Sequence, residues 1–187
     1  MNRHETDLSY RRFIFETSSQ YFASNFNCSP LTTLVVTPNL LYAIPFFNQS
    51  HVLVDSFSIY VSVAATGLAR MAIYHDSGAF SPQNLLLDSG NVGTGTTGRK
   101  SVLLTLRLEK CRLYWLAVQF TGAPTIVTIP ISSIPSSFFG ISLLTDTAPV
   151  NHLFIGFPFA PFPATFPTPY TLSTAIPPTF FLRLTER

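Results

Sequence analysis

Between residues 113 and 182 the chain carries a single formally charged side chain, that of Asp146. Prolines and glycines interrupt this stretch too often for a membrane-spanning helix of about 20 residues, so we expect no membrane span. Over the whole chain 11% of the residues are charged, whereas a soluble domain normally has about a quarter. A surface so poor in charge is expected to be partly covered by other subunits. We therefore expect a building block of an assembly rather than an enzyme.

The bulk composition narrows the possibilities further. A length of 187 residues fits one domain with an extension. The net charge of +2 comes without a long run of one sign, which argues against nucleic-acid binding. Residues 1–20 contain no apolar stretch typical of a signal peptide, so export is not expected. Cys28 and Cys111 lie in no metal-binding or redox motif, and we expect them to be buried free thiols.

Residues 1–32 differ from the rest because charged and aromatic side chains are mixed there without a regular period. A tail surrounded by solvent does not usually hold so many aromatic rings, so this segment is predicted to be an arm that docks onto another protein. A frayed tail is the alternative. The expected docking residues are Arg3, Arg11, Arg12, Phe13, Phe15, Tyr21 and Phe22.

Beyond Pro38 apolar and polar residues alternate, which is the period of a strand with one buried face. The clearest runs are residues 56–63 and 102–109, and shorter ones lie at 69–74, 85–87, 125–129 and 180–184. Residues 113–120 are apolar on both faces, as in a central strand that is covered on both sides. The expected core side chains are Phe57, Ile59, Val61, Val63 and Trp115.

No long segment has a convincing helical period, and the short strands are separated by turn residues. This pattern predicts an all-β fold, an antiparallel β-sandwich of jelly-roll type over residues 33–187. Prolines between residues 158 and 178 predict an extended segment, because each proline removes a backbone donor. The phenylalanines between these prolines are expected to pack on the domain or on a neighbouring molecule.

Motifs that carry chemistry are weak in this chain. The Gly/Thr run of residues 93–98 does not fit a phosphate-binding loop, because a strand pattern follows it, and it predicts a hairpin turn. Asp76 and Asp88 flank a loop and are possible ligand-facing residues together with the rings of Tyr74 and Tyr170. Their alternatives are a Ca²⁺ site, paired carboxylates acting on a glycan, or plain turn formation. No motif calls for a metal or a cofactor, and no catalytic residue is assigned.

Several short stretches resemble a module of tailed-bacteriophage structural proteins, the β-rich C-terminal part of minor tail and tail-fibre polypeptides. The resemblance spans residues 37–184. The matching stretches are LYAIPF (41–46), AIYHD (72–76), LDSG (87–90), LYWLA (113–117), GAP (122–124) and PATFP (163–167).

The resemblance implies a non-enzymatic virion protein that is assembled in the host cytoplasm and anchored by its N-terminal arm. Other virion proteins are the expected partners, and a homo-oligomer is the expected state, with a trimer favoured. Longer members of that group have more chain before the module, so a capsid decoration or cement protein is one alternative. A glycan-binding adhesion module, which would bind a host surface glycan through Tyr74 or Tyr170, is the other.

Overall fold

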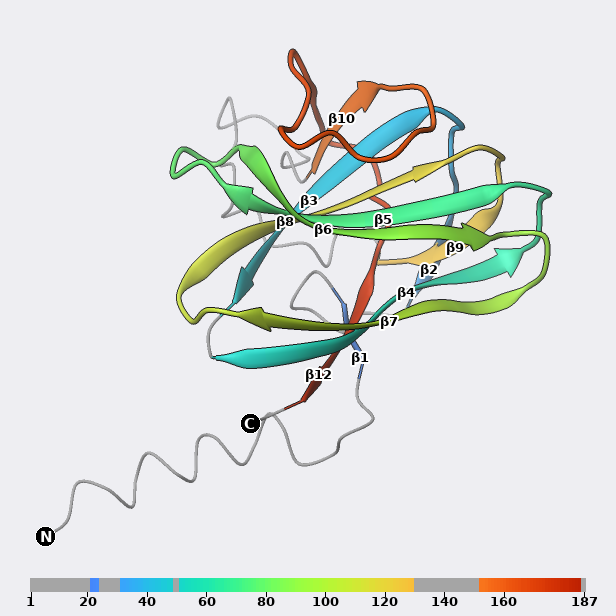
Figure 1. Ribbon diagram of the computed structural model, residues 1–187. Helices are drawn as coiled ribbons and strands as arrows, with labels where there is room; N and C mark the ends of the chain where they lie inside the picture. The colour runs from blue at the N-terminus through green and yellow to red at the C-terminus, as the bar shows by residue number, and fades with distance from the viewer. Residues whose placement is uncertain (1–20, 24–30, 49–50, 130–151, 186–187) are drawn as a thin grey trace, which may run out of the picture.

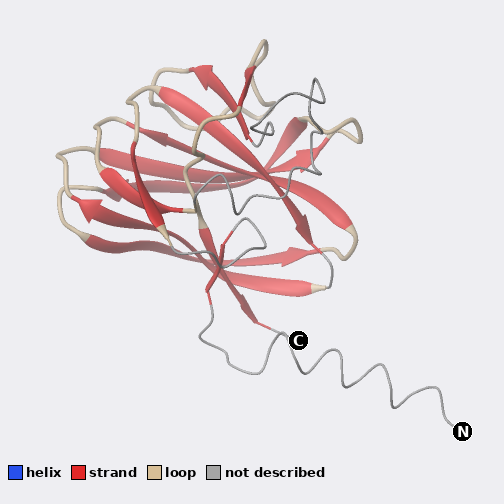
Figure 2. Ribbon diagram, turned by 180° about the vertical axis from the view of Figure 1, so that it is seen from behind, coloured by secondary structure: helices blue, strands red, loops and turns tan. Residues whose placement is uncertain are grey.

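The computed structural model describes residues 21–23, 31–48, 51–129 and 152–185. These residues form two antiparallel sheets of six strands each, packed face to face, and the described part contains no helix (Figures 1 and 2). Sheet 1 contains β1 (Tyr21–Ala23), β2 (Thr32–Val35), β4 (Val52–Val63), β7 (Gly98–Leu108), β9 (Thr125–Thr128) and β12 (Phe181–Thr185). Sheet 2 contains β3 (Leu40–Asn48), β5 (Leu68–Asp76), β6 (Pro82–Gly93), β8 (Arg112–Phe120), β10 (His152–Gly156) and β11 (Thr171–Ser173).

The strand order confirms the predicted jelly roll. In sheet 1 the neighbours run β2, β9, β4 and β7, and in sheet 2 they run β3, β8, β5 and β6. From β2 to β9 the chain changes sheet at every connection except the one between β5 and β6. Two sheets of four strands linked in this way form the double Greek key of a jelly roll.

The remaining strands extend this framework. In sheet 2, β10 pairs with β3 and β11 pairs with β10. In sheet 1, β12 pairs with Leu53–Ser58 of β4, and β9 pairs with Val61 and Val63 on the same side of that strand. β9 and β12 therefore run end to end along β4. At their junction the hydroxyls of Thr128 and Thr179 are 2.8 Å apart.

The main core lies between the two sheets, and alternation along the strands places its side chains there. In β7 the inward residues alternate with exposed ones along the whole strand, as the sequence predicts. Phe57, Ile59 and Val61 of β4 are fully buried in this core. The prediction for Val63 is wrong, because β4 ends there after a register shift against β9 and the side chain is 59% exposed.

A second apolar layer covers the outer face of sheet 2. Trp115 is fully buried as predicted, but it belongs to this outer layer and not to the core between the sheets. In β8 the neighbouring Tyr114 and Leu116 face the inner core instead. β8 pairs with β3 on one side and with β5 on the other, so the expected central strand that is covered on both faces is confirmed.

Proline is tolerated in β3 because of where that strand has neighbours. β10 pairs only with residues 40–43 of β3, so at Pro45 the described structure has a partner strand on the β8 side alone. A missing backbone donor is acceptable at such an edge. The proline-rich stretch contains one short strand, β11, and this too lies at a sheet edge.

Two turns differ from expectation. Residues 94–97 link β6 to β7, but these strands belong to different sheets, so the turn crosses the sandwich and is not a hairpin. Thr94 anchors it through its hydroxyl, which donates to the carbonyl of Ala65 at 2.9 Å. Cys111 lies in the turn between β7 and β8 and is exposed, not buried as predicted, and Cys28 lies outside the described residues.

Candidate functional site

Residues 157–170, which we call the strap, cross the outer face of sheet 2 in an extended conformation (Figure 1). Their polar contacts reach three strands, β5, β6 and β8, and the residue Asn39 just before β3. The main hydrogen bonds are Phe157 N to Asn39 O (2.9 Å), Gln119 Nε2 to Ala160 O (2.9 Å), Phe162 N to Asp88 Oδ2 (3.1 Å), Tyr74 Oη to Pro163 O (3.0 Å), Leu85 N to Ala164 O (2.8 Å) and Phe166 N to Gln83 O (2.8 Å). Proline has no backbone N–H to donate, so the strap makes these hydrogen bonds through its carbonyl oxygens and through the amides of its phenylalanines. The strap is fixed along its length.

The apolar side of the strap buries the outer face of sheet 2. Phe162 and Phe166 are almost fully buried beside Tyr74 and Trp115. The ring of Tyr74 meets that of Phe162 at 6.3 Å and that of Phe166 at 5.3 Å, both edge to face. Such aromatic pairs are stabilising beyond the area that they bury. The sequence left open whether these rings pack on the domain or on a neighbouring molecule, and they pack on the domain.

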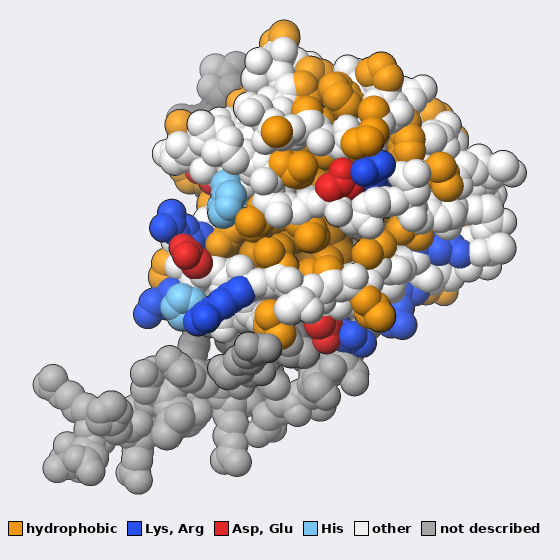
Figure 3. All heavy atoms as spheres, viewed as in Figure 1, with side chains coloured by type: hydrophobic (Ala, Val, Ile, Leu, Met, Phe, Trp, Pro, Cys, Tyr) orange, Lys and Arg blue, Asp and Glu red, His pale blue; other side chains and the backbone are white. Residues whose placement is uncertain are grey.

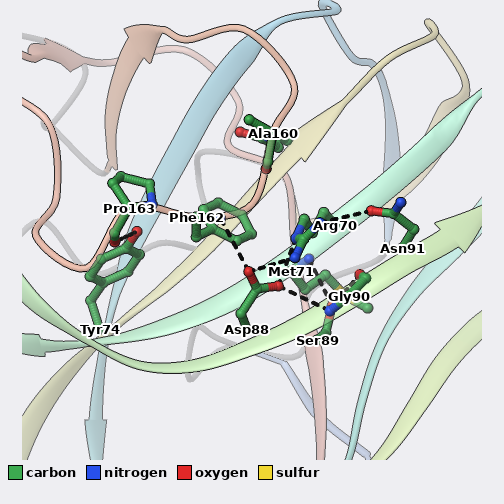
Figure 4. Close-up of polar contacts among 11 residues, drawn as sticks. Arg70, Met71, Tyr74, Asp88, Ser89, Gly90, Asn91, Ala160, Phe162 and Pro163 are labelled. Carbon is green, nitrogen blue, oxygen red and sulfur yellow. Dashed lines mark hydrogen bonds and ion pairs between the residues drawn. The ribbon is translucent and has the colours of Figure 1, made fainter.

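Asp88 is the polar centre under the strap (Figure 4). Arg70 donates to its two carboxylate oxygens from Nε at 2.7 Å and from Nη2 at 2.8 Å. The amides of Gly90 and Phe162 complete the set at 3.0 and 3.1 Å. Burial alone raises the pKa of Asp88, but these hydrogen bonds and the charge of Arg70 outweigh it and lower the pKa below its ordinary value. The carboxylate stays ionised and is occupied by protein donors.

Asp76 is also occupied. Its Oδ1 accepts a hydrogen bond from Trp115 Nε1 at 2.8 Å, and its Oδ2 accepts one from the amide of Gly78 at 2.7 Å. The sequence left three roles open for Asp76 and Asp88: a Ca²⁺ site, action on a glycan, or turn formation. The structure supports the third, because both carboxylates accept hydrogen bonds that hold turns and packed rings in place. Within the described part of the chain no group of three or more His, Cys, Asp or Glu side chains is arranged to hold a metal ion.

The two predicted stacking rings differ from expectation. Tyr74 is completely buried, so the prediction that it is an exposed platform for a sugar is wrong. Its hydroxyl donates to Pro163, and burial followed by the charge of Asp88 raises its pKa. Tyr170 is half-buried and packs edge to face on Phe166 at 6.2 Å. Of the four predicted ligand-facing residues, Tyr74 and Asp88 bind the strap, Tyr170 belongs to it, and Asp76 binds Trp115 beneath it.

The predicted docking arm is described only in part. Arg3, Arg11, Arg12, Phe13 and Phe15 lie outside the described residues. Tyr21 and Phe22 belong to β1, which pairs with β12 at one edge of sheet 1. This strand of the predicted arm is therefore part of the sandwich.

An exposed aromatic ring that the sequence did not single out lies in the turn between β5 and β6. Phe80 is 54% exposed, and its φ of 55° places it in the left-handed region. A bulky residue rarely adopts this conformation, and such strain costs about 1–3 kcal/mol. Strain of this kind concentrates at sites of function. Phe80 stands out by its backbone conformation, and no pattern in the sequence predicts that conformation.

Gln119 and Arg70 were also missed by sequence reasoning. Gln119 is fully buried in β8, where its Nε2 binds the strap while its Oε1 has no hydrogen-bond partner among the described residues. A buried polar side chain within an apolar strand is the signal that points to such a role. Arg70 offers a similar signal, as a cation within the largely apolar residues 68–74 of β5.

Fold and site together define a jelly-roll sandwich in which polar groups on the outer face of sheet 2 fasten a strap. The chain matches no protein-family model, no curated protein and no solved structure. No helix in the described residues is long and apolar enough to cross a membrane.

Proposed function

We propose that this chain is a non-enzymatic structural protein of a tailed-phage virion, a surface-exposed tail or tail-fibre module that acts as a homo-oligomer. The observation that carries the proposal is the use of the polar groups around the strap. Asp88 and Tyr74 bind the strap directly, and Asp76 binds the indole of Trp115, which packs beneath it. Titratable side chains that hold the fold together are less available for catalysis. This favours a structural component of a particle over an enzyme. The sequence resemblance to phage tail modules supports the same class.

The surface of the domain supports a role in an assembly. Large apolar side chains are exposed at several places, and the chain has few charges to separate copies. The exposed ones are Leu31, Val35, Tyr60, Val63, Leu68, Phe80, Leu103 and Leu172. A homo-oligomer of closed symmetry, with a trimer as the state we expect, would cover part of this surface.

The test is the position of the chain on purified particles. Gold-labelled antibody raised against the isolated domain should bind the tail of intact virions. Label on the capsid shell would favour the second candidate, a decoration or cement protein. Particles that lack the chain altogether would contradict both. The adhesion alternative is weakened by the burial of Tyr74, and binding to a glycan array would restore it.

The anchoring role of residues 1–20 can be tested separately. A chain that begins at residue 21 keeps β1 and should fold as the full chain does, because β1 still pairs with β12. It should fail to enter particles if Arg3, Arg11, Arg12, Phe13 and Phe15 dock onto another virion protein. A truncated chain that is incorporated normally would assign the anchor to another surface.

A further inference from the structure

The turn between β5 and β6 keeps its shape without help from the ring of Phe80. The amide of Ser77 donates to the carbonyl of Ser81 at 2.8 Å, and their hydroxyls are also 2.8 Å apart. The amides of Gly78 and Ala79 are bound by side chains within the same turn. Glycine would adopt a φ of 55° more easily than phenylalanine does. An exposed ring at a strained position therefore calls for a contact outside the turn.

A second apolar feature that is not fully buried lies between the edges of the two sheets. Among the described strands β6 ends sheet 2 and β7 pairs with β4 alone in sheet 1, and a band of apolar side chains lies between these two edges (Figure 3). The half-buried side chains of this band are Leu86, Val92, Val102, Leu104 and Leu106. None of them is charged, and neither are residues 77–81 around Phe80, although the carboxylate of Asp76 lies at the start of the turn and accepts the amide of Gly78. The band and the turn match in chemistry.

Pairing of the two edges with other strands is disfavoured. Register shifts interrupt β6 at three places, and an isolated bridge from Asn84 to Thr165 occupies its free side. β7 carries Arg99, Lys100 and Arg107 and no acidic residue. Two β7 edges paired antiparallel around a two-fold axis would bring these cations together, which is destabilising. Insertion of a side chain between the edges is the contact that remains.

We propose that Phe80 of one copy inserts into the apolar band between β6 and β7 of a second copy. The turn lies at the end of the sheet and the band lies along its side, so the contact joins different surfaces of the two copies (Figure 1). Repetition of such a contact closes into a ring when the rotation allows it. This inference rests on the proposed function, because it supplies the contact that holds the homo-oligomer together.

Sedimentation velocity of the full chain over a range of concentrations tests the proposal. Phe80→Ala removes the ring and should weaken self-association at least tenfold. Leu104→Lys should have the same effect, because it places a cation in the band while its aliphatic stem still covers the core. Leu86→Lys changes the other wall of the band and serves if Leu104→Lys fails to fold, which a melting curve detects.

Matched controls exclude general effects. Leu103→Lys adds the same charge to the same strand, but Leu103 is 75% exposed on the opposite face, so association should not change. Cys111→Gly relaxes an equally left-handed residue, with a φ of 55°, in another turn. It should leave association intact. Phe80→Gly should keep or raise the melting temperature while it loses association, which separates contact from stability.

Mixing the two kinds of variant gives the sharpest result. Phe80→Ala retains the band and Leu104→Lys retains the ring, so the mixture should form dimers although neither variant associates alone. A contact between identical patches, ring to ring or band to band, predicts no such rescue. A wild-type chain that stays monomeric at every concentration, or oligomers unaffected by Phe80→Ala, would overturn the inference. Neither result would affect the proposed place on the virion, which the antibody label tests independently.

Discussion

Arg70 and Asp88 form a bidentate ion pair between β5 and β6, with Nε to Oδ1 at 2.7 Å and Nη2 to Oδ2 at 2.8 Å. Their side chains are 16% and 19% exposed. Because Asp88 also accepts the amide of Phe162, the pair links two neighbouring strands to the strap. Charge-assisted bidentate contacts of this kind are both strong and geometrically specific.

Removing either partner should therefore loosen the strap. Arg70→Ala and Asp88→Ala should each destabilise the domain, and the double variant should lose less than their sum, by about 1–3 kcal/mol. Urea denaturation of the four proteins measures this coupling energy. Amide hydrogen exchange in residues 157–170 should rise in each single variant. Additive losses with unchanged exchange would mean that the pair does not hold the strap.

Buried His152 should make stability depend on pH. Burial lowers its pKa to about 4, and its ring lies 6.0 Å from that of Tyr42 and 6.3 Å from that of Phe154. In the unfolded chain the imidazole takes up a proton near its ordinary pKa of about 6.5, whereas in the fold it stays neutral down to about 4. Stability is therefore lost as the pH falls through this window, by on the order of 3 kcal/mol.

The His152→Gln variant provides the comparison for that pH profile. Urea denaturation between pH 7 and pH 4 should give a shallower decline for the variant than for the wild-type chain. Carboxylates titrate in both proteins, so the difference between the two profiles isolates the imidazole. Parallel profiles would show that His152 takes up its proton equally well in the folded and unfolded states.

Trp115 should be a main support of the outer apolar layer. Its ring is fully buried, and Trp115→Ala is expected to destabilise the domain by about 3–5 kcal/mol. Trp115→Phe keeps most of the ring but loses the hydrogen bond to Asp76, so it should cost clearly less. Guanidinium denaturation measures both. Equal losses in the two variants would assign the effect to the hydrogen bond rather than to the ring.

Gly122 should resist replacement because the backbone comes too close. A methyl group there would lie 2.5 Å from the carbonyl oxygen of Thr66, well inside a normal contact. Gly122→Ala should therefore destabilise by about 1–3 kcal/mol. Gly95→Ala is the matched control, because nothing lies within 4 Å of the added group. Thermal unfolding of both variants decides, and similar melting temperatures would contradict the prediction.

The strand framework was predictable because alternation is a local pattern. The period of residues 102–109 fixes which side of β7 is buried, and the two apolar faces of residues 113–120 place β8 at the centre of a sheet. The jelly-roll type of sandwich was predicted together with the all-β class, from short strands separated by turn residues. Val63 failed because a register shift between strands leaves no trace in the sequence.

The strap contacts could not be predicted for a related reason. Arg70 pairs across the sheet with Asn91 and binds its Oδ1, and a register shift before Ala72 brings the Arg70 side chain within reach of Asp88 as well. A β-bulge of this kind changes the direction in which a side chain points. The identities of Arg70 and Asp88 do not predict where the bulge lies. Tyr74 was taken for a surface ring because the sequence does not disclose that residues 89 positions later cover it.

The end-to-end arrangement of β9 and β12 along β4 has a consequence for synthesis. Residues Leu53–Ser58 of β4 pair with β12, more than a hundred residues later in the chain. While the ribosome is still translating the intervening residues, that side of β4 offers bare amides and carbonyls to any passing strand. Contacts so distant in sequence also form slowly. Nascent chains should therefore depend on chaperones until residue 185 has left the exit tunnel, and premature termination before β12 should yield aggregates rather than a smaller domain.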